Sequence, residues 1–326
     1  MTISAAGGMI VAKGRTNRQG GRTMARKGIA GFRRSARADG RNVFFFWDDP
    51  SRLPADYKSN IKAMQALHPD WSVQLADDGI IAGLLARDHP EISEVYGDIR
   101  VPACRSDIAR LAMLAAYGGW YLDADMSCRE PLDSFGTDRP IVFRRDDTAG
   151  MKARFRTMNG ILYMPPGHPL PHRMLAAVAA HIQDRRHLHD VLAFAGPKLL
   201  SDMVQETGVD DCEILSVKTH LRGRDPMFRE IRGASSFSWR IQQCFGILPV
   251  AEPDWEVFPP QLRPEFVPII KTFVAQFGLQ AWLPELALRR PGYMRVEGFA
   301  ELVRACGLQA YEQPVIGGRQ ASTTGG

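Results

Sequence analysis

Short apolar segments separated by stretches of helical spacing limit this chain to an α/β fold. Residues 42–47 form a continuous apolar and aromatic run, which is typical of a buried strand. Residues 53–67 then show helical spacing, and residues 71–75 alternate like a second strand. A third aromatic strand is expected at residues 120–122. Strand, helix and strand in this order predict a mostly parallel, Rossmann-like sheet with flanking helices.

The segment before the third strand has clear helix signals. A helix is expected after Pro102, with Ser106 as its N-cap, and apolar residues follow at helical spacing until Gly118 and Gly119 end it. Asp77-Asp78-Gly79 predicts a turn after the second strand. Further strands are expected at residues 141–143 and 161–164, and further helices at residues 171–183 and 196–204.

Composition divides the chain of 326 residues into four parts. Residues 1–40 carry nine Lys or Arg and one acid with little apolar periodicity, so we expect a disordered basic tail. Residues 41–260 are expected to form the α/β domain. Residues 261–317 show helical spacing of apolar residues, with helices predicted at 266–277 and 296–306. We expect them to form a helical C-terminal extension. Residues 318–326 are a flexible tail rich in Gly, Ser and Thr.

The formal net charge of +5 resides in the basic tail, because the remaining chain is slightly acidic. Clustered Lys and Arg can contact anionic lipid head groups or nucleic acid. The simpler interpretation is a solvated leader, since almost no aromatic residues are interleaved with its charges.

Five widely spaced cysteines form no C-x-x-C pair. This pattern argues against a disulfide framework and a zinc site and favours a reducing compartment. No apolar run approaches the roughly 18 residues of a membrane span, and the leader lacks the apolar segment of a secretory signal. The expected location is cytoplasmic, with possible peripheral contact between residues 1–40 and the inner face of the membrane.

The candidate chemistry centres on Asp123-Ala124-Asp125, at the carboxyl end of the third strand. Ligands of open α/β sheets bind at this end of the strands. In a strand, side chains two residues apart point the same way, so both carboxylates are expected to face one side. Hard oxygen ligands of this kind suit Mg²⁺ or Mn²⁺, which keep open positions for phosphate oxygens.

The surrounding block consists of a Ser-Asp dipeptide, an Arg three residues after the Asp, a Tyr-Gly-Gly, an aromatic strand and Asp-x-Asp. It closely resembles the signature of the DXD-containing glycosyltransferases, a family that includes the yeast initiating α-1,6-mannosyltransferase and bacterial capsular-polysaccharide transferases. Weaker similarity extends over residues 42–205. The resemblance implies a GT-A fold and transfer of a sugar from a nucleotide donor.

The resemblance also implies roles for individual residues. Asp125 would bind the metal directly, and Asp123 would bind it through water or contact the donor. Asp107 and Arg110 would contact donor sugar hydroxyls and phosphate, and Trp47 would stack on the nucleotide base. Further donor-binding candidates are Ser106, Tyr121 and Asn159.

The expected function is metal-dependent, retaining transfer of a hexose from a UDP-sugar or GDP-mannose to a glycan, lipid-linked or protein hydroxyl, in polysaccharide or glycoconjugate synthesis. One departure from the family concerns a late histidine near a Ser-Trp pair. Here the last histidine is His220, and Ser238-Trp239 lacks one. A non-catalytic protein that binds sugar nucleotides or glycans is therefore one alternative, and a basic-tailed protein that binds nucleic acid or a membrane is the other.

Overall fold

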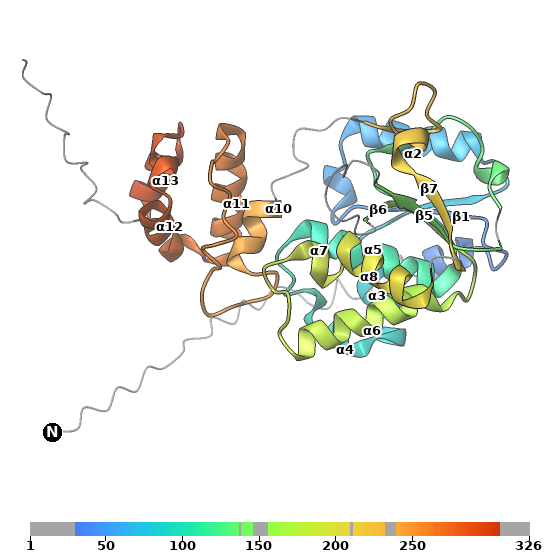
Figure 1. Ribbon diagram of the computed structural model, residues 1–326, viewed down its shortest axis with the longest axis horizontal. Helices are drawn as coiled ribbons and strands as arrows, with labels where there is room; N and C mark the ends of the chain where they lie inside the picture. Colours follow the sequence, from blue (N-terminus) through green and yellow to red (C-terminus); the bar gives the residue numbers. More distant parts are fainter. Residues whose placement is uncertain (1–29, 137, 146–155, 209–210, 232–238, 307–326) are drawn as a thin grey trace, which may run out of the picture. The chain divides into compact units, whose positions relative to one another are not determined.

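The computed structural model describes residues 30–136, 138–145, 156–208, 211–231 and 239–306. Contacts along the chain separate two compact units, Met1–Ala234 and Ser235–Gly326, which are treated in turn. The colours of Figure 1 follow the sequence, so the first unit runs from blue to yellow and the second from light orange to red.

A six-stranded sheet with strand order β2-β1-β3-β6-β5-β7 forms the centre of the first unit. β1 runs parallel to β2 and β3, and β5 runs parallel to β7, whereas β6 is antiparallel to both of its neighbours. The expected mostly parallel α/β sheet is confirmed. The strands are β1 (Asn42–Phe46), β2 (Ser72–Ala76), β3 (Gly119–Leu122), β5 (Ile141–Arg144), β6 (Thr157–Met164) and β7 (Glu213–Ser216).

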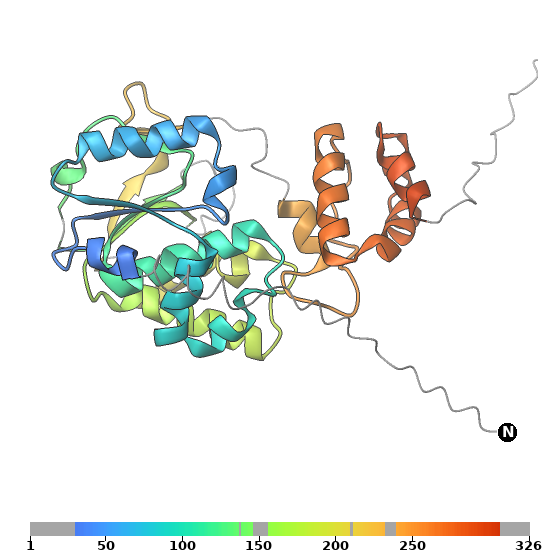
Figure 2. The same ribbon diagram turned by 180° about the vertical axis from the view of Figure 1, so that it is seen from behind.

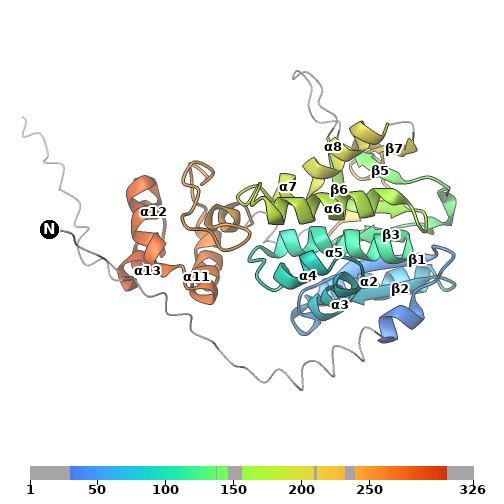
Figure 3. The ribbon, with the colours of Figure 1, turned by 90° about the horizontal axis from the view of Figure 1, so that it is seen from below.

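Helices cover both faces of this sheet, as Figures 1 and 2 show. On one face, α5 packs on β1, β3 and β6 and has α3 and α6 as neighbours, and α8 packs on β6 (Figure 3). On the other face, α2 packs over β2 and β4. The helices are α2 (Ala55–Leu67), α3 (Asp78–Asp88), α4 (Pro90–Tyr96), α5 (Pro102–Tyr117), α6 (Pro169–Gln183), α7 (Val191–Phe194), α8 (Pro197–Thr207) and α9 (Val217–His220).

Strand alternation divides the apolar side chains between these two layers. Val43 and Phe45 join one hydrophobic cluster with Ile61 and Met64 of α2. Phe44, between them in β1, points to the opposite face. All five residues of β1 are buried, so the buried strand expected from this apolar segment is confirmed.

A second, two-stranded antiparallel sheet lies beside α2 and is not anticipated by the sequence patterns. It pairs β4 (Met126–Cys128) with β8 (Phe228–Glu230), which are about a hundred residues apart in the chain. Phe228 is fully buried in the same cluster as Phe45. Such short strands gain their stability from this packing, because an isolated two-stranded sheet is marginal in water.

Two expected local assignments in the first unit are wrong. α5 begins at Pro102, where the sequence predicts its start, but proline at the first helical position begins the helix, so Ser106 lies inside α5 and is not its N-cap. Asp77 and Asp78 do not form a simple turn. The Asp77 side chain accepts a hydrogen bond from the amide of Ile80 at 2.8 Å and caps α3. Turn and N-cap favour the same residue types, which explains the misreading.

The expectation that residues 1–40 are disordered fails for its last part, and residues 1–29 lie outside the described ranges. Residues 30–35 are helical, and Phe32 is 5% exposed. Its ring stacks on Phe44 at a centroid distance of 5.7 Å and contacts Tyr117 at 6.1 Å. One aromatic residue among the arginines is therefore enough to anchor this segment to the sheet.

The second unit is helical around its own apolar core, in line with the expected helical texture. Its core includes Phe245, Phe258, Phe273 and Phe299. The compact units divide between Ala234 and Ser235, earlier than residue 260, because the region around Phe245 and Phe258 packs into the helical core. The helices are α10 (Trp239–Gln242), α11 (Val267–Phe277), α12 (Leu283–Arg289) and α13 (Phe299–Ala305).

Short 3-10 helices complete the described elements. They are η1 (Pro50–Arg52), η2 (Leu132–Ser134), η4 (Gln243–Phe245), η5 (Pro264–Phe266), η6 (Gln280–Trp282) and η7 (Pro291–Arg295). All five cysteines are free. Across the described ranges, no helix combines the length and apolar character needed to cross a bilayer.

Phe32→Ala tests whether the segment from residue 30 belongs to the folded unit. Removing a buried phenylalanine ring costs about 3 kcal/mol, so we expect the free energy of unfolding of the first unit to fall by about that amount in urea titrations. Arg34→Ala, at an exposed position of the same helix, should change it by less than about 0.5 kcal/mol. Equal stability of the two variants would contradict the anchoring role of Phe32.

Candidate active site

The predicted site residues converge at the carboxyl ends of β1 and β3, beside the first two turns of α5. Trp47 follows β1, and Asp123 follows β3 directly. Ser106, Asp107 and Arg110 lie on α5, where the i, i+3 and i, i+4 spacings place them on one helix face. Residues from three elements therefore meet at the edge of the sheet where open α/β folds bind ligands.

The Arg110 guanidinium lies at the centre of this group and is only 4% exposed. Its Nη2 lies 3.1 Å from Oδ1 of Asp123 and 3.0 Å from Oδ1 of Asp107. The same guanidinium donates to the Ser106 hydroxyl at 3.0 Å and to the backbone carbonyl of Asn159. A buried charge needs this degree of pairing, and the planar fork of donors on arginine can supply it.

Tyr121 connects the same carboxylate to the sheet. Its hydroxyl donates to Oδ1 of Asp123 at 2.9 Å and lies 3.0 Å from the Ser106 hydroxyl. The Arg110 guanidinium lies over its ring, 4.7 Å from the centroid, in cation–π geometry. Burial and the negative charge of Asp123 raise the pKa of Tyr121, so its hydroxyl remains a donor at neutral pH.

Asp107 is buried and has partners from two elements. The Asn159 amide on β6 donates to its Oδ1 at 2.8 Å, and Arg110 contacts the same oxygen. Burial raises the pKa of Asp107 to about 6, because desolvation outweighs the opposing attraction of Arg110. At neutral pH the group is therefore mainly an anion that can accept hydrogen bonds.

Two glycines leave room for these carboxylates. A Cβ at Gly160 of β6 would lie 2.6 Å from Oδ2 of Asp123, and a Cβ at Gly196 would lie 2.9 Å from Oδ2 of Asp107. Distances of this kind do not occur between ordinary side chains, so any larger residue would displace the carboxylate. The sequence patterns give no signal for either role, since both glycines act on residues distant in the chain.

The Asp123-Ala124-Asp125 motif lies on a turn, so the expectation that strand alternation aims both carboxylates to one side is wrong. β3 ends at Leu122, and the amide of Met126 donates to the carbonyl of Asp123 at 2.8 Å. The amide of Ile231 donates to the carbonyl of Asp125 at 2.6 Å and fixes the turn from the β8 side. The turn, rather than a pleated strand, sets the direction of each carboxylate.

Asp125 is a desolvated carboxyl group with negative neighbours. Burial, reinforced by the charges of Asp123 and Glu230, raises the pKa of Asp125 to about 7. Glu230 lies opposite Met126 in the β4–β8 pair and so comes close to the motif. Burial and the charges of Asp125 and Glu230 raise the pKa of Tyr57 on α2. Sequence analysis missed Glu230 and Tyr57, because only the pairing of distant strands and the packing of α2 bring them here.

Trp47 contributes to the site through ring packing. It is partly buried and meets Tyr57 edge-on at a centroid distance of 5.6 Å, and its amide donates to the carbonyl of Ala76 at 3.0 Å. Its position at a strand end agrees with a base-stacking role, which stays a prediction.

The late part of the chain supplies no histidine at the observed network. His220 hydrogen-bonds to the carbonyl of Ser216 through Nδ1 at 3.0 Å and packs edge-on against Phe143. Ser238 lies outside the described residues, and Trp239 begins α10 of the second unit.

The donor set fits a divalent cation with open coordination positions. The residues that the structure describes hold no ready-made group of three His, Cys, Asp or Glu side chains. Asp123 and Asp125 can supply two hard oxygen ligands, with water and phosphate oxygens completing the shell. The region holds three aspartates, Asp107, Asp123 and Asp125, beside one guanidinium. The raised pKa of Asp125 reflects its burial first and the charges of Asp123 and Glu230 next. A cation would remove that penalty.

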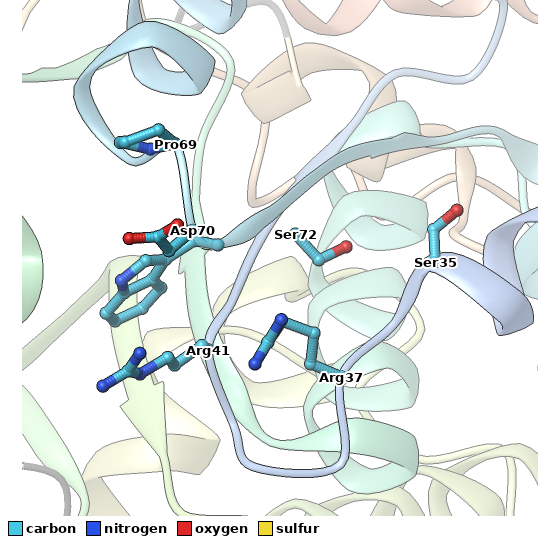
Figure 4. A pocket seen from close by; sticks show the side chains of 7 residues that line it. Ser35, Arg37, Arg41, Pro69, Asp70 and Ser72 are labelled. Atoms are coloured by element: carbon cyan, nitrogen blue, oxygen red, sulfur yellow. The ribbon is translucent and has the colours of Figure 1, made fainter.

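A shallow hollow of about 500 Å³ lies at the opposite ends of the strands, where β1 and β2 begin (Figure 4). It is lined by residues that precede β1 and β2, including Arg37, Arg41 and Trp71. Arg37 already forms an ion pair with Asp39 at 2.7 Å, which weakens its field toward an anion. The arrangement of charges therefore favours the site around Arg110 over this hollow as the place where an anionic ligand binds.

Comparison with known proteins gives a family match for part of the chain. Residues 54–142 match the model of a family described as "Glycosyltransferase sugar-binding region containing DXD motif". This part of the chain is therefore similar to the DXD glycosyltransferases. The matched region holds α2, the Arg110 helix and the Asp123-Ala124-Asp125 turn.

Curated relatives of the DXD region include two yeast enzymes. "Inositol phosphoceramide mannosyltransferase 2" of Schizosaccharomyces pombe is 29% identical over 119 residues, or 36% of this chain and 32% of the relative. A "Mannosyl phosphorylinositol ceramide synthase" of Saccharomyces cerevisiae is 26% identical over 144 residues, or 40% of this chain and 36% of the relative. The matches thus span about a third of the length of these relatives.

A solved structure named "PaToxG Glycosyltransferase" aligns with a TM-score of 0.40 and 16% identity, covering 57% of this chain and 78% of that one.

Asp125→Asn in the metal-free protein tests the electrostatics of the DXD turn. Because folding raises the pKa of Asp125 from 3.8 to about 7, the folded state binds its proton more tightly than the unfolded state. The resulting stability is present at low pH and is lost as the pH rises from about 4 to about 7. Thermal unfolding should therefore show a higher Tm for Asp125→Asn than for the wild type at pH 8, with a smaller difference at pH 5.

Asp202→Asn on α8 is the matched control, because Asp202 is exposed. It should show no such difference between the two pH values. An Asp125→Asn variant with lower stability than the wild type at pH 8 would contradict the picture of an uncompensated buried anion.

Proposed function

We propose that this chain transfers a hexose from a nucleotide-sugar donor, a UDP-sugar or GDP-mannose, to a hydroxyl acceptor. The proposed reaction requires Mn²⁺ or Mg²⁺ and retains the anomeric configuration, as the family resemblance implies. The acceptor would be a glycan, lipid-linked or protein hydroxyl, in polysaccharide or glycoconjugate synthesis. The lipid case has the added support that one relative is named an inositol phosphoceramide mannosyltransferase and another a mannosyl phosphorylinositol ceramide synthase.

The buried Arg110 network is the observation that carries this proposal. It holds Asp107 and Asp123 by one guanidinium, whereas Asp125 forms no ion pair with the residues that the structure describes and has a raised pKa. Desolvated charges of this kind are costly to stability, so they indicate a functional site rather than a structural ion pair. A diphosphate with its divalent cation supplies the charge partner that the arrangement lacks.

Each residue of the network has a specific task in this proposal. A cation held by Asp123 and Asp125 would stabilise negative charge on the departing diphosphate. Arg110 keeps Asp123 oriented and adds positive charge beside the phosphates, so that little reorganisation is needed as the glycosidic bond breaks. Asp107, oriented by the Asn159 amide, accepts hydrogen bonds from hydroxyls of the donor sugar.

Trp47 extends the proposed donor site toward the neighbouring strand. Stacking of a nucleotide base on its ring would contribute about 1 to 3 kcal/mol to binding. Tyr57 supports the indole from the side, which limits its rotation and favours one stacking geometry.

Location and tail contacts remain part of the proposal. The cysteine pattern supports a cytoplasmic location, and all five thiols are free. Clustered Lys and Arg in residues 1–40 support peripheral contact with an anionic membrane surface.

A donor screen tests the proposed reaction. Release of nucleotide from UDP-glucose, UDP-galactose, UDP-N-acetylglucosamine and GDP-mannose is measured with Mn²⁺, with Mg²⁺ and with excess chelator. We expect slow hydrolysis of at least one donor that requires the cation. Asp125→Ala should abolish this hydrolysis and leave the circular dichroism spectrum unchanged, whereas Asp202→Ala should retain it.

The same screen separates the alternatives. Donor binding without turnover in the presence of acceptors would favour the non-catalytic sugar-nucleotide protein. Turnover that survives Asp125→Ala would remove the metal role assigned to the motif.

Gly160→Ala tests whether the position of the Asp123 carboxylate matters. The added Cβ would lie 2.6 Å from Oδ2 of Asp123 and push that group away from its place beside Arg110. We expect donor hydrolysis to fall by about a hundredfold or more, as when a charge-stabilising group is lost. Gly97→Ala, where a Cβ meets nothing within 4 Å, should retain wild-type rates. Similar rates for both variants would mean that Asp123 does not need its observed position.

A further inference from the structure

Asn60 is a polar residue on the buried face of α2. It is 7% exposed, and Ile61 and Met64 of the same helix are buried in the apolar cluster beneath the sheet. Asparagine is a weak helix former, and burying an amide costs free energy unless it is hydrogen-bonded. Neither helix propensity nor core packing therefore accounts for an asparagine at this position.

The side-chain amide of Asn60 reaches the turn that bears Asp125. Its Nδ2 donates to the carbonyl of Met126 at 2.7 Å and to the carbonyl of Ala124 at 3.2 Å. These two carbonyls flank Asp125 on either side. One amide group thus fixes the backbone immediately before and immediately after the predicted metal ligand.

With these bonds, every carbonyl of the turn has a donor. The carbonyl of Asp123 accepts from the amide of Met126, and that of Asp125 accepts from the amide of Ile231. The carbonyls of Ala124 and Met126 accept from Asn60. Buried carbonyls without donors are costly, so removal of the Asn60 amide would favour a different turn conformation.

α2 also contacts Trp47, the residue expected to stack on the nucleotide base. Tyr57 lies three residues before Asn60, on the same side of α2, and meets Trp47 edge-on. α2 therefore touches both Trp47 and the Asp125 turn, which come from different strands. Because one helix makes both contacts, we expect it to keep the distance between Trp47 and Asp125 constant.

We propose that Asn60 is a positioning residue that holds Asp125 in its metal-binding orientation through the two flanking carbonyls. This inference rests on the proposed function for its consequence in catalysis, whereas the constraint on the turn does not depend on it. Asn60 itself contacts backbone only and acts through Asp125.

Asn42 offers a matched control within the same sheet. It is a fully buried asparagine at the start of β1, the opposite end of that strand from Trp47. Its amide donates to the carbonyls of Arg37 at 2.8 Å and Gly118 at 3.3 Å. Asn42→Leu therefore removes the same kind of bonds at similar burial but away from the Asp125 turn.

Hydrogen–deuterium exchange of the full chain tests the constraint without any ligand. Asn60→Leu should raise the exchange rate of the amides in residues 123–128 by about tenfold or more, the effect of leaving buried carbonyls unpaired. Asn42→Leu should leave those amides unchanged and affect residues near Arg37 and Gly118. If a leucine variant fails to fold, Asn60→Ser and Asn42→Ser replace the pair.

The affinity of the protein for Mn²⁺ alone is measured by calorimetry. A general loss of folding stability should leave this affinity unchanged as long as the protein remains folded. We expect Asn60→Leu to weaken binding by about tenfold, as typical for residues that orient metal ligands, and Asn42→Leu to leave it unchanged. Unchanged exchange in residues 123–128, or equal effects of both variants there, would overturn the proposal, and so would unaltered Mn²⁺ affinity in Asn60→Leu. Faster exchange in Asn60→Leu while the wild type binds neither Mn²⁺ nor donor would confirm the constraint and reject the proposed function instead.

Discussion

Burial of the Arg110 guanidinium determines how the other groups at this edge of the sheet are arranged. A charge that is 4% exposed must be neutralised locally, and Asp107 and Asp123 provide that neutralisation from a helix and from a strand end. The pairing therefore fixes the first turns of α5 against the carboxyl end of β3. Tyr121 and Ser106 share the same hydrogen-bond network, which orders the site before any ligand arrives.

Within the described ranges, the same network leaves Asp125 outside any ion pair. Arg110 serves Asp107 and Asp123, while Asp125 lies beyond the end of the strand among negative neighbours. Its raised pKa is the electrostatic cost of keeping that position. Proteins retain such costs mainly where function requires them, and a bound divalent cation with a diphosphate would relieve this one.

The sequence predicted which residues come together better than it predicted their geometry. The Ser-Asp, Arg, Tyr-Gly-Gly and Asp-x-Asp spacing identified Asp107, Arg110 and Asp123, which the structure brings within hydrogen-bonding distance. These residues are close in the chain, so helix and strand periodicity can place them. The turn at Asp123 was not predicted, because it depends on amide donors from Met126 and Ile231.

Features that depend on distant contacts were beyond reach of sequence patterns. Pairing of β4 with β8 brings Glu230 to the motif, and packing of α2 brings Asn60, across more than sixty residues in each case. The anchoring of Phe32 was hidden by the arginines around it. In the second unit, Phe245 and Phe258 belong to the helical core although their surroundings carry little helical periodicity.

A crystal structure of the chain with Mn²⁺ and a nucleoside diphosphate is the most direct test of this account. It should show the cation coordinated by the Asp125 carboxylate, the diphosphate beside Arg110, and the base against Trp47. Nucleotide density at the hollow of Figure 4, or a cation bound away from Asp123 and Asp125, would contradict it.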